Sequence, residues 1–542
     1  MSENNRNSIE KCRKKLPQFT TMNAIDGQAG LVIYSSLIFY SLTIDNILNI
    51  IVLLILAAVS IATLTGPNGL LTRANEAKES TKQAEKEEQT TLSTYEDYID
   101  KYTNEVMVDQ VTDMSPGILE GNGTEVEPYV INSIEDLVFF AYDVTNGNTY
   151  EDKYVTLGLS LDFNSTKSYV DAYRTDYGIY GYDGALKTLL TSGDGFKPIG
   201  TNYDADMSTN YFCGIFDGNS KVIANLRLYH ENSEYVSMVG FFTTNGGKIK
   251  NLIINKANIT SITNNMHILS GILVGRNSGT ILNCAVSGNA SLTDNGEKSI
   301  YYGGLVGQSY GTIENCFSKA QLEIVSNKNS IVSIGGISGN NTGDYIRNCY
   351  NLGTINIFLN NDINILAGGI TGNIFNKKIE NSYNSGIINL YVDNNEQTKS
   401  IEIGNVTGRG SSGATIKNCF NIGDININHS IKNNQYFVSN IVGNIEGSIS
   451  NCYNIGKINT ENINSQFIGQ IAGNAYKSVL DDCSGIINGN SDVIGFQHSA
   501  TTIKNVKLID KSEIPDILSI LGNEFKEDIN KINNGYPLLS WQ

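Results

Sequence analysis

The sequence has very few of the residues that most enzymes use for acid–base and metal chemistry. It contains four histidines among 542 residues, at His230, His267, His429 and His498. None of them lies in an HExxH motif, and the chain has no GxxxxGK[ST] phosphate loop. These absences remove the usual sequence signatures of zinc peptidases and P-loop NTPases, and we predict no catalytic residue, no metal and no cofactor.

Charged residues are also scarce, and positive charge is the scarcer sign. Charged residues make up 17% of the chain, and the formal net charge is −17. Nucleic acids and anionic lipid surfaces both require a basic footprint on the protein that binds them. The composition therefore argues against a nucleic-acid partner and predicts a surface covered mainly by Asn, Ser, Thr and Tyr.

Stretches with helical periodicity are few, and a repeated phrase occupies most of the chain instead. A Gly-Gly-aliphatic-x-Gly turn followed by Asn-Cys-aromatic recurs between Gly271 and Cys483, most plainly at Gly303–Phe317 and Gly335–Tyr350. The asparagines of this phrase are spaced by 32, 33, 33, 37 and 33 residues, at Asn283, Asn315, Asn348, Asn381, Asn418 and Asn451. A fixed period in this range indicates a repeat array.

The phrase predicts an all-β fold, a right-handed parallel β-helix (solenoid) with short capping helices. Short aliphatic runs alternate with Gly, Asn and Ser clusters, which is typical of strands separated by turns. We expect about three strands of ~5 residues in each coil and coils stacked ~4.8 Å apart. The repeated asparagines would form a ladder at one corner, and the glycines would supply positive φ or close backbone approach.

Helices are expected only at the two ends of the array. Ser133 stands three residues before Asp136, an N-cap pattern that predicts a short helix running to about Val144. Residues 511–521 and 536–541 would cover the far end, because an uncovered coil exposes a sheet edge.

Six of the eight cysteines occupy the same position of the repeat, at Cys284, Cys316, Cys349, Cys419, Cys452 and Cys483. Ser382 fills that position in the one coil without a cysteine. A column spaced by whole coils cannot supply four converging zinc ligands, and it does not form pairs. We therefore predict small core side chains here, with disulfides and metal binding as the less favoured alternatives.

The N-terminal region determines the expected location. Residues 47–64 are uncharged and apolar, nearly the ~20 residues that a spanning helix needs. Lysines and an arginine between positions 11 and 15 place the N-terminus in the cytoplasm and the repeats outside for a single span. Residues 31–44 form a shorter apolar run, and a second span there would return the repeats to the cytoplasm. No clear A-x-A site follows the run at 47–64, so we expect an anchor that is retained rather than cleaved.

The predicted organisation then follows the chain. It consists of a cytoplasmic or interfacial segment at 1–46, a transmembrane anchor at 47–64, a helical stalk at 65–105, a linker at 106–130, an N-terminal cap with the first coils at 131–230, the repeats at 231–510 and a C-terminal cap at 511–542.

The repeat resembles the GLUG motif of bacterial surface proteins, which Gly304-Leu305-Val306-Gly307 reproduces literally. The resemblance covers about residues 130–542 and implies a β-helix without implying an activity, since this motif also occurs in the non-catalytic region of some immunoglobulin A metallopeptidases. Residues 51–87 resemble the anchor and helix of pilin-like exported proteins. The chain departs from that group in having no Gly-Phe or Gly-Met prepilin cleavage junction ahead of the apolar run.

Three functions remain open from the sequence. The first is a membrane-anchored extracellular protein for adhesion or ligand binding without catalysis, whose expected partners are surface glycans or proteins of the host or of bacteria. The second is a carbohydrate-active β-helix enzyme of the polysaccharide lyase or hydrolase type, and the third is a pilin-like filament subunit. The candidate acids are Asp204, Asp206 and Asp217, with Tyr203, Tyr211 and Lys221 near them in sequence, and candidate contact tyrosines are Tyr169, Tyr173, Tyr177, Tyr180 and Tyr182. Asp217 stands in a turn sequence, where aspartate usually serves the turn itself.

Overall fold

The structure is a computed structural model of the chain. It describes residues 119–164, 195–202, 210–231, 236–264, 266–328, 331–360, 363–392, 400–428, 435–460, 467–487, 492–510, 513–531 and 533–542. The chain divides into two compact units, residues 1–85 and 86–542, and only the second contains described residues. The predicted anchor and stalk lie outside the described residues. Within the described ranges, no helix has the length and apolarity that crossing a membrane requires.

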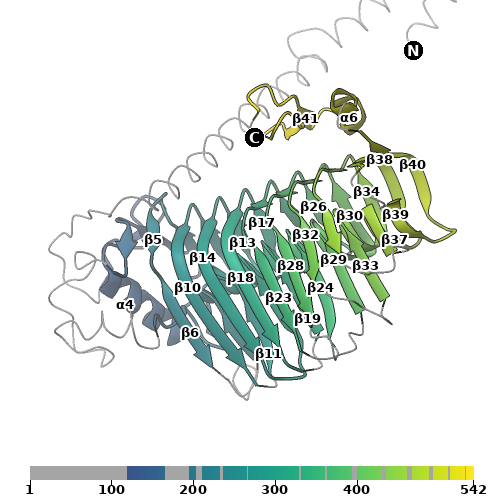
Figure 1. Cartoon of the computed structure of the whole chain (residues 1–542). Coiled ribbons are helices and arrows are strands. Elements are labelled where there is room, and N and C mark those ends of the chain that lie inside the picture. Colours follow the sequence, from purple (N-terminus) through teal and green to yellow (C-terminus); the bar gives the residue numbers. More distant parts are fainter. Residues whose placement is uncertain are drawn as a thin grey trace, which may run out of the picture. The chain divides into compact units, whose positions relative to one another are not determined.

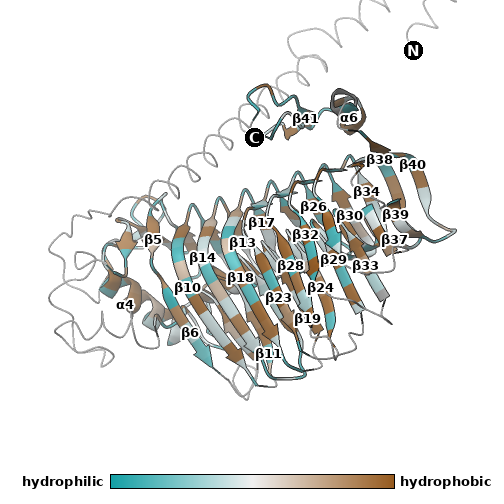
Figure 2. Ribbon diagram, in the orientation of Figure 1, coloured by the Kyte–Doolittle hydropathy of each residue, from teal (hydrophilic) through white to brown (hydrophobic). Residues whose placement is uncertain are grey.

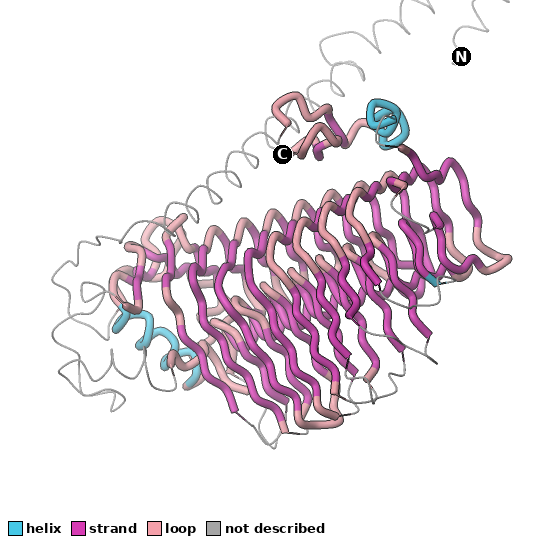
Figure 3. The backbone as a smooth tube through the Cα atoms, viewed as in Figure 1, coloured by secondary structure: helices cyan, strands magenta, loops and turns pink. Residues whose placement is uncertain are grey.

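The described residues between 119 and 510 form a right-handed parallel β-solenoid of about eight turns, which confirms the predicted fold class (Figure 1). The strands stack in four columns, and each strand pairs in parallel with strands of the coils before and after it. Figure 3 shows these strands lying side by side along the solenoid.

One column contains β3 (Leu161–Asp162), β5 (Val222–Ala224), β6 (Arg227–Glu231), β10 (Ile253–Thr263), β14 (Ala285–Asp294), β18 (Phe317–Ser326), β22 (Tyr350–Asn351), β23 (Ile355–Leu359), β27 (Tyr383–Asn384), β28 (Ile388–Val392), β31 (Phe420–Asn421), β32 (Ile425–Asn428), β35 (Tyr453–Asn454) and β36 (Ile458–Thr460). The second contains β7 (Val236–Val239), β11 (His267–Ser270), β15 (Ile300–Gly303), β19 (Ile331–Gly335), β24 (Asn364–Gly368), β29 (Ser400–Gly404), β33 (Gln435–Ser439) and β37 (Ile468–Ala475).

The third column contains β8 (Phe242–Asn245), β12 (Val274–Asn277), β16 (Val306–Ser309), β20 (Ser338–Asn341), β25 (Thr371–Phe375), the first part of β30 (Thr407–Lys417) and of β34 (Val442–Ser450), and β39 (Asp492–Gln497). The fourth contains β1 (Tyr129–Ile131), β2 (Tyr154–Leu157), β4 (Ile215–Asp217), β9 (Lys248–Lys250), β13 (Thr280–Leu282), β17 (Thr312–Glu314), β21 (Tyr345–Arg347), β26 (Lys378–Glu380), the last parts of β30 and β34, and the first parts of β38 (Val479–Ile486) and β40 (Thr502–Ile509), whose last parts continue the first column. A full coil such as β15 to β18 therefore has four strands, where the sequence predicted about three.

The predicted asparagine ladder forms at the corner that precedes the cysteine column. The seven corner asparagines from Asn251 to Asn451 all have positive φ, between 48° and 53°. Five side-chain bonds of 2.9–3.1 Å connect neighbouring coils, beginning with Asn251 to Asp217. The ladder is interrupted twice, where Asn283 Oδ1, Asn315 Nδ2 and Asn348 Oδ1 lack partners. Asparagine suits this corner because its short side chain tolerates the left-handed region.

The motif glycines serve close approach rather than the corner conformation. A Cβ atom on Gly303 would lie 2.0 Å from the carbonyl oxygen of Val306, and one on Gly335 would lie 2.2 Å from that of Ser338. No L side chain fits at those distances. Of the two roles expected for glycine, close backbone approach is therefore the one that the repeat uses.

The interior of the solenoid is a continuous column of Ile, Leu, Val and Cys side chains. Figure 2 marks the hydrophobic residues along the strands in brown. All six cysteines of the column are fully buried and free, which confirms the predicted packing role. The Cys316 and Cys452 sulfurs lie 3.0 and 3.2 Å from the carbonyl oxygens of Glu314 and Ser450, to which the thiols donate. Burial raises the pKa of the Cys316, Cys452 and Cys483 thiols well above the usual value.

Helix α4 (Ile134–Thr145) closes the N-terminal end of the solenoid, as predicted. The Ser133 hydroxyl accepts a hydrogen bond from the Asp136 amide at 3.1 Å and so caps the helix. The fully buried side chains of Ile134, Leu137 and Phe140 continue the interior column.

The C-terminal segment does not occupy the position that we expected. It contains α6 (Ile514–Leu521) and the antiparallel pair β41 (Phe525–Lys526) and β42 (Leu538–Leu539). Instead of covering the last coil, it packs on the outside of the coils against a stack of aromatic rings, Phe317, Tyr350, Tyr383, Phe420 and Tyr453. Neighbouring rings in this stack are 4.7–5.0 Å apart, and the Trp541 indole donates to the carbonyl oxygen of Asn381 at 3.1 Å. Burial of the apolar surface on the side of the solenoid therefore stabilises this position of the segment.

Candidate ligand-binding face

One outer face of the solenoid presents a regular column of asparagine side chains. Alternate residues of β23, β28, β32 and β36 point inward and are mostly buried, so the residues between them point outward. Parallel register places one outward asparagine from each strand in line, at Asn356, Asn389, Asn426 and Asn459. We call this set the amide column.

The amide column is hydrogen-bonded along its whole length. Each Nδ2 donates to the Oδ1 of the preceding coil at 2.8 Å, from Asn389 to Asn356, from Asn426 to Asn389 and from Asn459 to Asn426. An asparagine amide has two N–H donors and an oxygen with two lone pairs. The two central amides therefore each keep one N–H and one lone pair beyond those used in the column, on side chains that are half-buried.

Aromatic side chains border the amide column on one side. Phe358 and Tyr391 lie two residues after Asn356 and Asn389, so they point to the same face. Their rings are stacked with centroids 4.8 Å apart, and both side chains are half-buried. They give this part of the face an apolar ridge with a phenolic hydroxyl.

Beyond Tyr391 the face contains a shallow depression of about 430 Å³. The residues that line it are Asn426, Ile427, Asn428, Ile458, Asn459 and Thr460. All six are uncharged, and four of them carry amide or hydroxyl groups. Charges stand at the border, on Glu323 beside Asn356, on Asp424 two residues before Asn426, and on the exposed Lys457 two residues before Asn459. The surface can thus exchange hydrogen bonds with a ligand without requiring a charge on it.

The acids that the sequence singled out do not form a site in the described structure. Asp204, Asp206 and Tyr203 lie outside the described residues, as do the five tyrosines between 169 and 182. Asp217 is occupied by structural contacts: its carboxylate accepts from the Asn219 amide at 2.8 Å and from Asn251 Nδ2 at 3.0 Å, and it pairs with Lys250 at 2.9 Å. Asp217 therefore serves its turn and anchors the corner ladder.

One further pattern, Gly307–Gly311 (GQSYG), matches the GxSxG phrase of serine hydrolases. Its serine, Ser309, is fully buried at the end of β16, accepts from Asn277 Nδ2 at 3.2 Å and donates to the carbonyl oxygen of Gly311. A nucleophile elbow instead exposes its serine between a strand and a helix. Ser309 is one member of an interior polar ladder.

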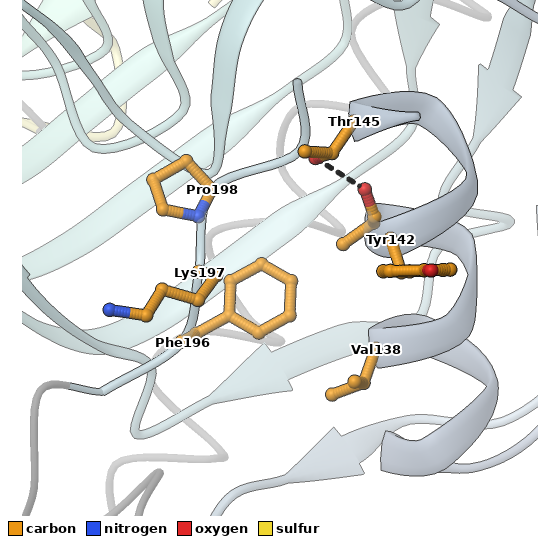
Figure 4. Close-up of a pocket in the computed structure, with 7 residues that line it drawn as sticks. Val138, Tyr142, Thr145, Phe196, Lys197 and Pro198 are labelled. Atoms are coloured by element: carbon orange, nitrogen blue, oxygen red, sulfur yellow. Dashed lines mark hydrogen bonds between the residues drawn. The ribbon is translucent and has the colours of Figure 1, made fainter. Parts of the chain in front are cut away.

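A cavity of about 160 Å³ lies between the cap helix and the first coil (Figure 4). Val138, Ala141, Tyr142 and Thr145 of α4 form one wall, and Phe196, Lys197 and Pro198 form the other. The Thr145 hydroxyl faces this space and donates to the carbonyl oxygen of Ala141 at 2.7 Å. Small-molecule sites usually measure 300–1,000 Å³, so this cavity is a packing gap beneath the cap.

Across the part of the chain that the structure describes, no three His, Cys, Asp or Glu side chains gather in a way that could hold a metal ion. The amide column was missed by the sequence analysis, although its signal is present. Its asparagines are spaced by 33, 37 and 33 residues, the same spacing as the corner asparagines from Asn348 to Asn451.

Comparisons with known proteins give limited similarity. No family model matches the chain. A segment of 177 residues, 33% of this chain, is 28% identical to halomucin of Haloquadratum walsbyi, and the match spans only 2% of the length of that protein. A crystal structure of a Bacteroides ovatus protein proposed to be an immunoglobulin A1 protease covers 79% of this chain and 96% of its own, with 21% identity and a TM-score of 0.38.

Proposed function

We propose that this protein is a cell-surface β-solenoid that binds neutral, hydroxyl-rich carbohydrate without catalysis, through the amide column and the depression beside it. The observation that carries the proposal is the column itself, with unused N–H donors and lone pairs on central amides of a half-exposed face. A sugar hydroxyl both donates and accepts, so it can use both functions of such an amide.

The chemistry of the face favours a neutral glycan over an acidic one. No charged side chain lies in the amide column or in the lining of the depression. The whole chain carries −17, so a sulfated or uronic-acid polymer would approach against repulsion. Phe358 and Tyr391 add an apolar ridge that can contact the C–H surface of a sugar ring.

The cell-surface part of the proposal rests on the N-terminal apolar run at 47–64 and on the similarity to halomucin, which is named as a mucin. The GLUG-type phrase at 304–307 accords with the same location. The predicted anchor keeps the N-terminus in the cytoplasm and the solenoid outside.

Binding of the full chain to an array of neutral and acidic glycans tests the ligand. We expect retention of neutral glycans, with an affinity that changes little between low and high salt, because no ion pair contributes. Asn426→Ala removes an amide that donates to Asn389 and accepts from Asn459. Losing one or two ligand hydrogen bonds of about 1 kcal/mol each should weaken binding roughly tenfold.

Asn444→Ala is the matched control, because Asn444 is a half-buried asparagine that accepts from Asn474 at 2.9 Å on a different strand column. Its variant should bind like the parent protein. Equal loss in both variants, or binding confined to acidic glycans, would overturn the assignment of this face.

Protease treatment of intact cells tests the location separately. An epitope placed after Gln542 should be removed by external protease, leaving a short N-terminal fragment in the membrane fraction. Protection that disappears only on permeabilisation would contradict a surface location and would indicate that residues 31–64 cross the membrane twice.

A further inference from the structure

The two ends of the solenoid differ in how the interior column terminates. At the N-terminal end, α4 covers the first coils with side chains that are fully buried. At the other end, the last coil is formed by β39 and β40. Within the described ranges, β39 pairs only with β37, and β40 pairs only with β38.

The last coil continues the apolar interior without covering it. Ile494 stacks on Ala472, Ile503 on Leu480 and Val506 on Cys483. The three inner residues of these pairs are fully buried, whereas Ile494 and Val506 are half-buried and Ile503 is 38% exposed. Other large apolar side chains are exposed near this end, at Tyr476, Val479, Ile487 and Phe496.

Such an end offers apolar area and strand edges with which no described strand pairs. Unpaired edge strands bind further strands readily, and soluble proteins usually cover or charge them. Here the C-terminal segment, which could have covered the end, packs on the side of the coils instead.

The distribution of charge on the chain favours a second copy of this protein as the partner at this end. The chain as a whole carries −17, yet residues 492–510 contain two acids, Asp492 and Asp510, and two lysines, Lys504 and Lys507, and so carry no net charge. Copies that repel one another elsewhere therefore meet little repulsion at this end. Within the coil the signs are divided, because β39 contains one acid and no base, and β40 contains two lysines and no acid.

We propose that two copies of this protein associate end to end through the last coil, about a two-fold axis perpendicular to the solenoid axis. The rotation reverses the direction of the coil, so β39 of each copy lies antiparallel to β40 of the other. In both ladders the strand that carries Asp492 then lies beside the strand that carries Lys504 and Lys507, of which Lys504 also pairs with Asp481 of its own chain at 3.2 Å. The contact is isologous, because each copy uses the same surface. Since α4 covers the opposite end of each solenoid, the assembly is a closed dimer and does not continue into a filament.

The size of the last coil is sufficient for such a contact. Residues 492–510 number 19, and with Tyr476, Val479 and Ile487 they approach the 20–30 residues per partner that typical stable interfaces contain, about 800 Å² on each side.

The mass of the full-length protein in mild detergent, measured by light scattering across a concentration series, tests the proposal. We expect a dimer for the parent protein and a halved protein mass for Ile503→Lys, which places a charge at the contact. Ile331→Lys is the matched control, because Ile331 is 45% exposed at the start of β19, away from the last coil. That variant should remain dimeric.

Circular dichroism and thermal unfolding should be alike for the two variants, which separates loss of contact from loss of fold. Hydrogen exchange gives a second measurement, in which amides of β39 and β40 become protected on raising the protein concentration. A parent protein that stays monomeric throughout, or a dimer that Ile503→Lys leaves intact, would overturn the proposal. Neither result depends on whether the amide column binds glycans.

Discussion

At a corner asparagine, the contribution of backbone conformation to stability can be measured separately from the contribution of the side-chain hydrogen bonds. Asn418 has a φ of 52°, donates to Asn381 at 2.9 Å and accepts from Asn451 at 3.1 Å. Replacing it with alanine removes two hydrogen bonds of about 1 kcal/mol each and places alanine in the left-handed region, which costs roughly 1–2 kcal/mol more. We therefore expect Asn418→Ala to lower the free energy of unfolding by about 3–4 kcal/mol.

Asn418→Gly loses the same two bonds but adopts the left-handed conformation without strain. After the extra chain entropy of glycine, roughly 0.5–1 kcal/mol, this variant should remain more stable than Asn418→Ala by about 0.5–1 kcal/mol. Urea unfolding followed by circular dichroism measures the difference.

Asn444 supplies the control, since it also takes part in a side-chain ladder but lies in a strand and does not have positive φ. There the order should reverse, with Asn444→Gly less stable than Asn444→Ala. If glycine is no better than alanine at position 418, the left-handed corner is not what selects asparagine, and the reasoning fails.

Two further predictions concern the cysteine column and the C-terminal segment. Burial raises the pKa of the Cys452 thiol, so its stabilising contribution is complete below the unfolded pKa of about 8.5 and is lost as the pH rises above it. Between pH 7.5 and 9.5 the free energy of unfolding should fall by about 1.4 kcal/mol in total for each such thiol, and Cys452→Ser should remove one thiol's share of that fall in urea titrations; an unchanged fall would contradict this. Trp541→Ala should release the C-terminal segment, because it removes a large side chain that is 8% exposed and lies 6.1 Å from the rings of Tyr350 and Tyr383. Replacing a buried Trp or Phe with Ala usually lowers the free energy of the packed state by about 3–5 kcal/mol. Limited proteolysis should therefore cut residues 513–542 of Trp541→Ala faster than those of the parent protein, and Trp541→Phe should be cut at an intermediate rate.

The 33-residue period made most of the solenoid predictable from the sequence. Each coil must place chemically similar residues at equivalent positions, so the corner asparagines and the buried cysteines could be assigned to columns from their spacing alone. Ser382 supports this logic, since its hydroxyl accepts from the Cys349 amide at 3.1 Å and donates to the carbonyl oxygen of Glu380, as the cysteines do with their own carbonyls. The helix at 134–145 was predictable because Ser133 and Asp136 form a local cap.

The position of the C-terminal segment was not predictable in this way. The segment contains no repeat, so nothing in it specifies which surface it covers. The surface that the segment covers does show a repeat. In five successive repeats an aromatic residue follows the Asn-Cys or Asn-Ser pair and points outward, and the stacked rings form an apolar strip on the side of the solenoid. A repeated outward aromatic indicates a covered surface, and that rule would have placed Trp541 on the side of the coils.

The amide column and the aromatic strip recur with the same period, but the C-terminal segment covers only the strip. The polarity of the side chains explains this difference. The strip from Phe317 to Tyr453 is covered by the segment from Ile517 to Trp541, whose apolar side chains bury it. The amide column is polar, so covering it would bury little apolar area, and its amides bond to one another along the column while the central ones keep one N–H and one lone pair each. A polar ladder that is bonded along its length keeps its geometry without a cover. That is the property a binding face needs, because its donors and acceptors are held in place before a ligand arrives.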